Sequence, residues 1–258
     1  MNVVPVHIHF FEKDRYSGYQ EDFIKILDKC LVQRAVIFGN EEADETTAAC
    51  LIAFKKKFPA RIFGIPEINI KEKTALKKMH DYVKKNQMSG IKIFPSKCLC
   101  YPDNKKMFGL YKKALDLKVP LVFHSGRVPG DMQKYGLVKY AQPIALDEVA
   151  GRFPQLQILI SHAGNPMFEQ TLMIGNRKNI HLDLCGVTGV WRDKFPLLFE
   201  RFGAQRLLHG GPNHYHGKYL QENIIRMQEL LSAAKLSEEE KSMIMGKNAI
   251  RIFNLEKD

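Results

Sequence analysis

Long apolar runs are missing from this sequence, and cysteine is scarce. No stretch approaches the roughly 18 consecutive apolar residues of a membrane-spanning helix, so we expect no transmembrane segment and no membrane partner. The first residues lack a basic segment followed by an apolar one, so no secretory signal is expected. The five cysteines are odd in number and lack framework spacing, which favours a reducing compartment over a disulfide scaffold. These absences predict a cytoplasmic protein.

Acidic residues are also in deficit, and the formal net charge is +11. Nucleic-acid binders gather such charge on one face with aromatic platforms. Here the lysines fall in short clusters such as Lys55–Lys57, Lys77–Lys78 and Lys84–Lys85, which are typical of solvated helix faces. We therefore expect no nucleic-acid partner, although a positive field could still steer an anionic substrate.

The 258 residues alternate between short apolar runs and segments of helical periodicity. The repeat is roughly 30 residues, the size of a βαβ unit. Eight units in sequence predict an α/β fold, a single (β/α)8 TIM barrel over residues 1–258. The expected strands are Val3–His9, Arg34–Phe38, Arg61–Pro66, Gly90–Phe94, Pro120–His124, Gln157–His162, Asn179–Leu184 and Arg206–Gly210.

The helical segments support this assignment. Lys105–Leu117 and Tyr219–Ala234 each place apolar residues at three-and-four spacing, and Ser237–Phe253 begins with a serine and three glutamates typical of a helix N-terminus. An open doubly wound sheet is the rival fold, but no Gly-x-Gly-x-x-Gly fingerprint follows the first strand.

Histidines recur where the expected strands end. His7 and His9 form a His-x-His pair at the end of the first strand, and alternate strand residues point the same way. His124 and His162 end the fifth and sixth strands, so four imidazoles should meet at the mouth of the barrel. Imidazole favours zinc and other transition metals, and three histidines plus a water make a catalytic zinc shell.

These motifs resemble the amidohydrolase superfamily, specifically the amidohydrolase-related branch that includes aminocarboxymuconate-semialdehyde decarboxylase. The resemblance rests on the His-x-His pair, Gly90–Lys92, Phe123–Gly126, Ser161–Gly164, Asp183–Gly186 and Gly246–Phe253. It implies a metal-dependent barrel enzyme with His7, His9 and His124 as ligands of one divalent transition metal, with zinc the first choice. It further implies that His162 is the catalytic base that activates water.

The eighth strand departs from the family pattern. Its relatives usually end this strand in an aspartate that binds metal, whereas this chain reads Leu207-Leu208-His209-Gly210-Gly211-Pro212. Three outcomes stay open. A three-histidine site is sufficient; or Asn213, His214 or His216 takes the place of the aspartate; or the chain is a catalytically inactive ligand-binding barrel.

Three further residues are candidates for substrate binding. Lys92 lies in the fourth strand and faces either the interior or an acidic partner. Arg127 follows the His124 strand and can clamp a carboxylate. Trp191, the only tryptophan, lies in the loop after strand seven and lines the pocket or packs beneath the loop. Glu67 and Asp183 end strands three and seven, where carboxylates can orient ligand imidazoles.

We therefore expect a hydrolase in which metal-activated water attacks a small, carboxylated substrate. The alternative reaction on the same site is decarboxylation. The expected partner is a small molecule, and a homodimer is left open.

Overall fold

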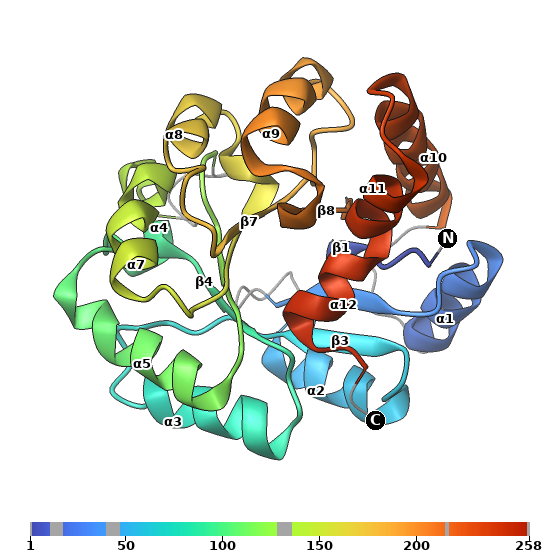
Figure 1. Cartoon of the computed structure of the whole chain (residues 1–258). Coiled ribbons are helices and arrows are strands. Elements are labelled where there is room, and N and C mark those ends of the chain that lie inside the picture. The colour runs from blue at the N-terminus through green and yellow to red at the C-terminus, as the bar shows by residue number, and fades with distance from the viewer. Residues whose placement is uncertain (1, 11–17, 40–46, 128–135, 215–216, 257–258) are drawn as a thin grey trace.

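The computed structural model describes residues 2–10, 18–39, 47–127, 136–214 and 217–256. Short parallel strands form a ring, with helices around the outside (Figure 1). The strands are β1 (Val6–His9), β2 (Ala35–Phe38), β3 (Ile62–Ile65), β4 (Ile91–Ile93), β5 (Leu121–Phe123), β6 (Ile158–Ile160), β7 (Ile180–Asp183), β8 (Leu207–Leu208) and β9 (Gly210–His214). Each expected strand coincides with an observed one, usually one residue shorter at either end.

Two sheets share the ring, in the orders β3-β2-β1-β9 and β4-β5-β6-β7-β8. A parallel bridge between Glu67 and Lys92 joins β3 to β4. The strand expected over Arg206–Gly210 is interrupted at His209: β8 pairs with β7, and β9 pairs with β1. These connections close an eight-position barrel, so the predicted (β/α)8 fold is confirmed.

Helices follow most strands and cover the outside of the ring. They are α1 (Tyr19–Lys29), α2 (Ala48–Lys57), α3 (Ala75–His80), α4 (Pro95–Cys98), α5 (Phe108–Leu117), α7 (Leu146–Arg152), α8 (Phe168–Met173), α9 (Phe195–Phe202), α10 (Gly217–Ala233), α11 (Glu238–Ser242) and α12 (Asn248–Phe253). The start expected near Ser237 is confirmed, because Ser237 and Glu240 form a capping box on α11.

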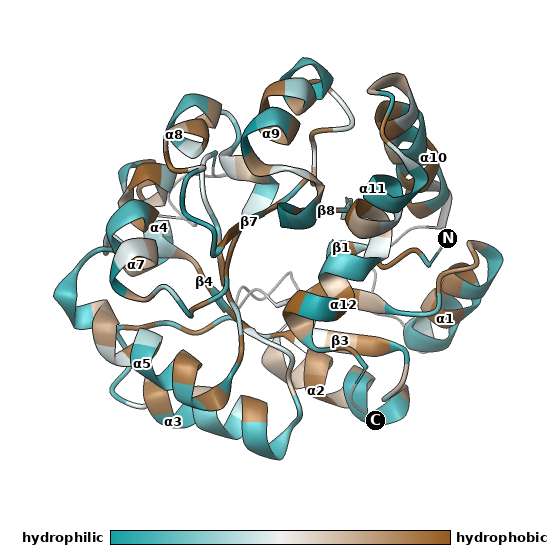
Figure 2. Cartoon of the chain, viewed as in Figure 1, coloured by the Kyte–Doolittle hydropathy of each residue, from teal (hydrophilic) through white to brown (hydrophobic). Residues whose placement is uncertain are grey.

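Alternation along the strands sorts the core into two parts. Outward residues such as Ile37 and Phe123 pack against the helices, whereas inward residues such as Phe38 and Val122 fill the barrel. Ile252 and its neighbours on α12 pack against this inner cluster, so the C-terminal helix covers the N-terminal end of the barrel. In Figure 2 the strands are mainly brown, while the helices alternate between brown and teal.

The cysteines, the hydropathy of the helices and the lysine clusters can be compared with the expectations from composition. All five cysteines are free thiols. None of the described helices has the length and hydropathy needed to cross a membrane. Lys55 is an exception to the solvated lysine clusters, because it is buried and its Nζ donates to the backbone carbonyl of Pro59 over the ring of Phe63.

Candidate metal centre

The first strand delivers two imidazoles to the inside of the barrel. The register between β1 and β9 shifts between Val6 and Ile8, and the intervening His7 has a positive φ of 67°. Such a bulge re-aims a side chain without ending the strand. His7 and His9 are both buried, with ring centroids 5.1 Å apart, and both rings contact Phe38. The expectation that the pair projects together is confirmed.

Strands β5 and β6 supply two more imidazoles to the same place. His124 directly follows β5, and its ring stacks on Phe94 at 4.0 Å. His162 lies two residues beyond β6, with its ring 4.3 Å from that of His7 and 5.4 Å from that of His124. The four strand-end histidines therefore lie at one end of the barrel, as expected, and their individual roles stay predictions.

His162 reaches this position through an unusual backbone. His162 and Ala163 have φ values of 56° and 51°, a left-handed conformation that L side chains adopt at an energetic cost. The backbone N–H of His162 donates to Asp183 Oδ1 at 3.1 Å. A buried carboxylate therefore helps to hold the strained turn that carries this imidazole.

Asp183 connects three parts of the centre. It is completely buried at the end of β7 and accepts hydrogen bonds from His7 Nδ1 at 2.8 Å and from the backbone N–H groups of His162 and Cys185. Burial alone would raise the pKa of Asp183, but the charge and hydrogen bond of His7 lower it below its ordinary value. Asp183 thus orients His7, as its position after strand seven suggested.

Burial keeps the other imidazoles neutral. It holds the pKa of His9 well below its usual value, with a further contribution from the charge of Lys92. Burial, followed by the charges of His162 and Lys92, lowers the pKa of His124 in the same way. Burial and then the charge of His7 lower the pKa of His162 to about 3, far from the unperturbed value near 6.5 on which its choice as a base rested.

Each of the three predicted ligands has one ring nitrogen engaged by an oxygen acceptor. His7 Nδ1 donates to Asp183, and His124 Nε2 donates to the carbonyl of Arg127 at 3.0 Å. The ring of His9 bonds the carbonyl of Phe38, and its buried Nδ1 has no partner among the described residues. This pattern, in which an outer acceptor fixes the ring, is typical of metal-ligating histidines. The residues present therefore fit a divalent metal.

Among the described residues, the candidate ligand atoms that lie close enough together to share one ion belong to a group that contains His7 but neither His9 nor His124. Atoms of His7, His162, Asp183 and Cys185 lie within 4.8 Å of one another. Sequence reasoning did not include Cys185, although its place two residues after Asp183 could have suggested it. Burial, with the charge of Asp183, raises the pKa of the Cys185 thiol well above its usual value. A neutral thiol is a poor metal ligand, which weakens Cys185 as a ligand but leaves His7, His162 and Asp183 close enough together to bind an ion.

The predicted substrate-binding residues differ in their surroundings. Lys92 is buried, and its Nζ lies 5.9 Å and 5.6 Å from the ring centroids of Phe38 and Phe94. The side chain of Arg127 is exposed, next to His124. Trp191 packs on Phe168 with ring centroids 5.5 Å apart, which fits packing beneath its loop. None of these roles is tested by the structure.

Glu67 is the second strand-end carboxylate, and Asn213, His214 and His216 are the three candidates to replace the strand-eight aspartate. Glu67 Oε2 accepts from Lys97 Nζ at 3.2 Å. The register of β9 on β1 places Asn213 beside Ile8 and His214 beside His9, at the level of the centre. The side chains of Asn213 and His214, and all of His216, lie outside what the structure describes.

Removing the Asp183 carboxylate should destabilise the fold strongly. We expect Asp183→Ala to lower the free energy of unfolding by about 3–5 kcal/mol, because three buried donors lose their acceptor. The matched control is Asp147→Ala, whose carboxylate pairs with Arg177 at the surface and should contribute about 1 kcal/mol or less. Urea denaturation of both variants measures the difference, and equal losses would contradict the role assigned to Asp183.

The model of a family described as Amidohydrolase matches residues 5–255. No curated protein matches the sequence.

Solved structures resemble the chain over most of its length. An uncharacterised TIM-barrel protein from Bordetella bronchiseptica is 16% identical, with a TM-score of 0.77 and 99% of each chain covered. 2,6-Dihydroxybenzoate decarboxylase from Rhizobium is 14% identical, with a TM-score of 0.74 and 100% of each chain covered. A probable 2-pyrone-4,6-dicarboxylic acid hydrolase from Acinetobacter baumannii, solved with citric acid, is 14% identical, with a TM-score of 0.71 and 98% of this chain and 100% of the other covered.

A metal is present in solved structures of one similar enzyme. 5-Carboxyvanillate decarboxylase from Novosphingobium aromaticivorans, with bound manganese, is 15% identical, with a TM-score of 0.67 and 90% of this chain and 80% of the other covered. At such identities these likenesses establish the shared fold.

Proposed function

The chain belongs to the amidohydrolase family, an enzyme family, and we propose that it is a metal-dependent hydrolase acting on a small carboxylated molecule. One observation carries the proposal. Three buried imidazoles from β1 and β5 and the half-buried imidazole of His162 meet at the barrel mouth, and each of the three predicted ligands has one ring nitrogen engaged by a carbonyl or carboxylate. This arrangement fixes the orientation of each ring and directs its second nitrogen toward a cation.

His7, His9 and His124 would hold the metal, with zinc as our first choice. A bound divalent metal supplies Lewis-acid activation of water and of a substrate oxygen. Imidazole ligands suit zinc, whereas manganese prefers oxygen ligands, and this chain lacks the aspartate expected at the end of strand eight. The manganese of the similar decarboxylase makes that ion the second choice.

The chain's own residues prepare the site for an anionic substrate. The charge of buried Lys92 acts on His9, His124 and His162, lowering the pKa of each. A carboxylate entering this region would gain from the same positive potential. Arg127, exposed beside His124, would contact a substrate carboxylate at the rim.

His162 is the proposed proton acceptor. Its ring bonds the carbonyl of Cys185, which leaves the other nitrogen free to take a proton from an attacking water. The pKa of about 3 makes it a weak base in isolation, and an anionic substrate nearby would raise that value.

Decarboxylation is the second candidate reaction. Two of the similar solved structures are decarboxylases of hydroxybenzoate-type acids, which also require a carboxylated substrate. Both reactions need the same cation and the same positive surroundings, so the products distinguish them.

The test combines metal analysis with a paired substrate screen. Protein prepared without chelators should contain close to one zinc or manganese per chain. Carboxylated lactones, esters and hydroxybenzoates should turn over, whereas matched compounds without the carboxylate should not. Release of carbon dioxide would select the decarboxylase, and an acid or alcohol product the hydrolase. Protein that stays metal-free after addition of zinc and manganese would instead be a ligand-binding barrel.

A further inference from the structure

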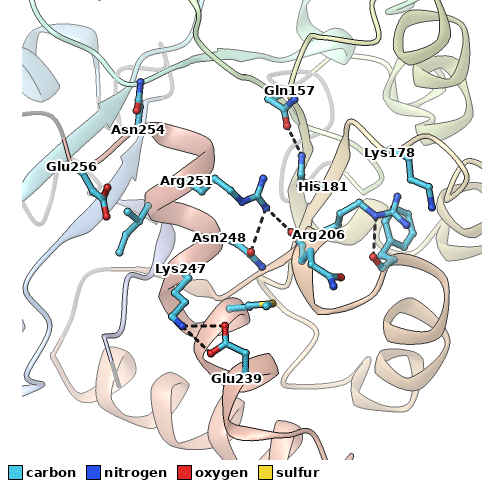
Figure 3. A pocket seen from close by; sticks show the side chains of 14 residues that line it. Gln157, Lys178, His181, Arg206, Glu239, Lys247, Asn248, Arg251, Asn254 and Glu256 are labelled. Carbon is cyan, nitrogen blue, oxygen red and sulfur yellow. Dashed lines mark hydrogen bonds and ion pairs between the residues drawn. The ribbon is translucent and has the colours of Figure 1, made fainter.

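A pocket of about 990 Å³ opens at the end of the barrel opposite the metal centre (Figure 3). Gln157, His181 and Arg206 line it from the starts of β6, β7 and β8, and α12 contributes Asn248 and Arg251. On β7, His181 lies near the start of the strand and Asp183 at its end, and both face the barrel interior. The pocket and the metal centre therefore lie at opposite ends of this strand. Pockets of this size hold small organic ligands.

The lining of this pocket is positively charged. It contains Lys178, Arg206, Lys247 and Arg251 against Glu239 and Glu256, a formal surplus of two positive charges from four basic and two acidic side chains. Lys247 is already neutralised, because its Nζ contacts both carboxylate oxygens of Glu239. The surplus therefore resides on the other three basic residues.

Arg206 supplies charge but already uses most of its hydrogen-bond donors within the protein. Its guanidinium is buried, and its Nε, Nη1 and Nη2 donate to four backbone carbonyls, those of Phe202, Gly175, Arg177 and Arg201. A charge fixed in this way cannot swing toward a ligand, but it raises the potential at the pocket floor.

Arg251 and Lys178 retain hydrogen-bonding capacity. Arg251 uses Nη2 to bond the carbonyl of Gln205 and the side chain of Asn248, while its Nε and Nη1 have no hydrogen-bond partner among the described residues. Lys178 is exposed, and it makes no ion pair with any of the residues that the structure describes. Figure 3 draws Arg251 near the middle of the pocket.

The floor beneath these cations is polar. His181 is buried, its Nε2 bonds Gln157 Oε1 at 2.7 Å, and its Nδ1 has no partner among the described residues. Burial, followed by the charges of Arg251 and Arg206, lowers the pKa of His181 to about 3. The imidazole is therefore neutral and adds no charge to the pocket. The lowered pKa is consistent with a positive potential from the two arginines at the pocket floor.

We propose that this pocket is a second binding site, for a small organic dianion whose charge lies on phosphate or carboxylate groups. Two net positive charges match a dianion, and the free edge of the Arg251 guanidinium suits either head group. The site is separate from the candidate metal centre and does not depend on the proposed reaction.

Isothermal titration calorimetry with inorganic phosphate and with succinate tests the site and distinguishes the two sources. Saturable binding of either probe is expected, with the tighter probe identifying a phosphate ester or a dicarboxylate as the ligand class. Arg251→Gln and Lys178→Gln should each weaken binding about tenfold or more, because a hydrogen bond to a charged group is lost. Both side chains are exposed, so these variants should fold. The control Arg152→Gln, at the surface of α7, should leave the affinity unchanged.

A final variant assigns the bound anion to one end of the barrel. His9→Ala, at the metal centre, should keep phosphate or succinate binding. The proposal is wrong if neither probe binds at millimolar concentration, or if binding survives Arg251→Gln and Lys178→Gln but is lost in His9→Ala.

Discussion

Replacing His162 with asparagine should reduce turnover at least about a hundredfold while metal content stays near that of the native protein. A positioned base typically contributes about 10²–10⁴-fold, and asparagine cannot take the proton. The effect should be large here because the strand-eight sequence Gly210-Gly211-Pro212 offers no side chain that accepts a proton. Relatives with an aspartate in that strand have a second group for the task.

Asparagine also suits the backbone at this position. His162 has a φ of 56°, and asparagine tolerates this left-handed region better than most residues. The hydrogen bond from the backbone N–H of residue 162 to Asp183 does not depend on the side chain. The substitution should therefore remove the imidazole while leaving the turn in place.

A histidine outside the metal centre provides the control. His209 bonds Asn223 on α10 through Nε2 at 2.7 Å, so His209→Asn removes a buried imidazole outside the centre. It should lower stability more than turnover. Steady-state kinetics and elemental analysis of both variants measure the outcome. Loss of metal in His162→Asn would make His162 a ligand, and unchanged turnover would place the base elsewhere, with His214 and His216 the next candidates.

Local sequence patterns were enough to predict most of the barrel. Strands such as Ala35–Phe38 and Ile158–Ile160 are continuous apolar runs, as parallel strands covered on both faces must be. Histidines at the ends of such runs had to meet, because the carboxyl ends of parallel strands share one edge of the barrel. The eighth strand was harder, since its break at His209 follows from pairing with both neighbours.

Gly210, directly after the break at His209, allows a close approach between two backbone segments. A side chain on Gly210 would collide with the backbone of Cys185, with a Cβ only 1.9 Å from its nitrogen. The strand therefore approaches the backbone that follows β7 too closely for a residue with a side chain. Such long-range contacts leave no periodic signal in the sequence.

Features that depend on three-dimensional proximity escaped sequence reasoning. The hydrogen bonds of Asp183 with the ring of His7 and with the backbone of His162 join residues far apart in the chain. The shift of the His162 pKa to about 3 depends chiefly on burial, which only the folded packing determines. The basic pocket at the opposite end likewise gathers Lys178, Arg206 and Arg251 from separate elements.

The second large effect concerns metal binding itself. We expect His7→Ala/His9→Ala to abolish metal binding, from close to one ion per chain to none, because two of three ligand nitrogens are removed. Elemental analysis after dialysis against zinc measures the loss. Retention of a full equivalent of zinc would contradict the ligand assignment.

Single substitutions then separate the two overlapping groups of ligands. His9 belongs only to the set of three histidines, whereas Cys185 belongs only to the alternative group with His162 and Asp183. We expect His9→Ala to lose the metal and Cys185→Ser to keep it. The physical reason lies in protonation: His9 already presents an unprotonated, unpartnered Nδ1, whereas the buried Cys185 thiol would first have to ionise against its raised pKa. The opposite result, with zinc kept in His9→Ala and lost in Cys185→Ser, would move the centre toward β7 and make Asp183 a ligand in place of the missing strand-eight aspartate.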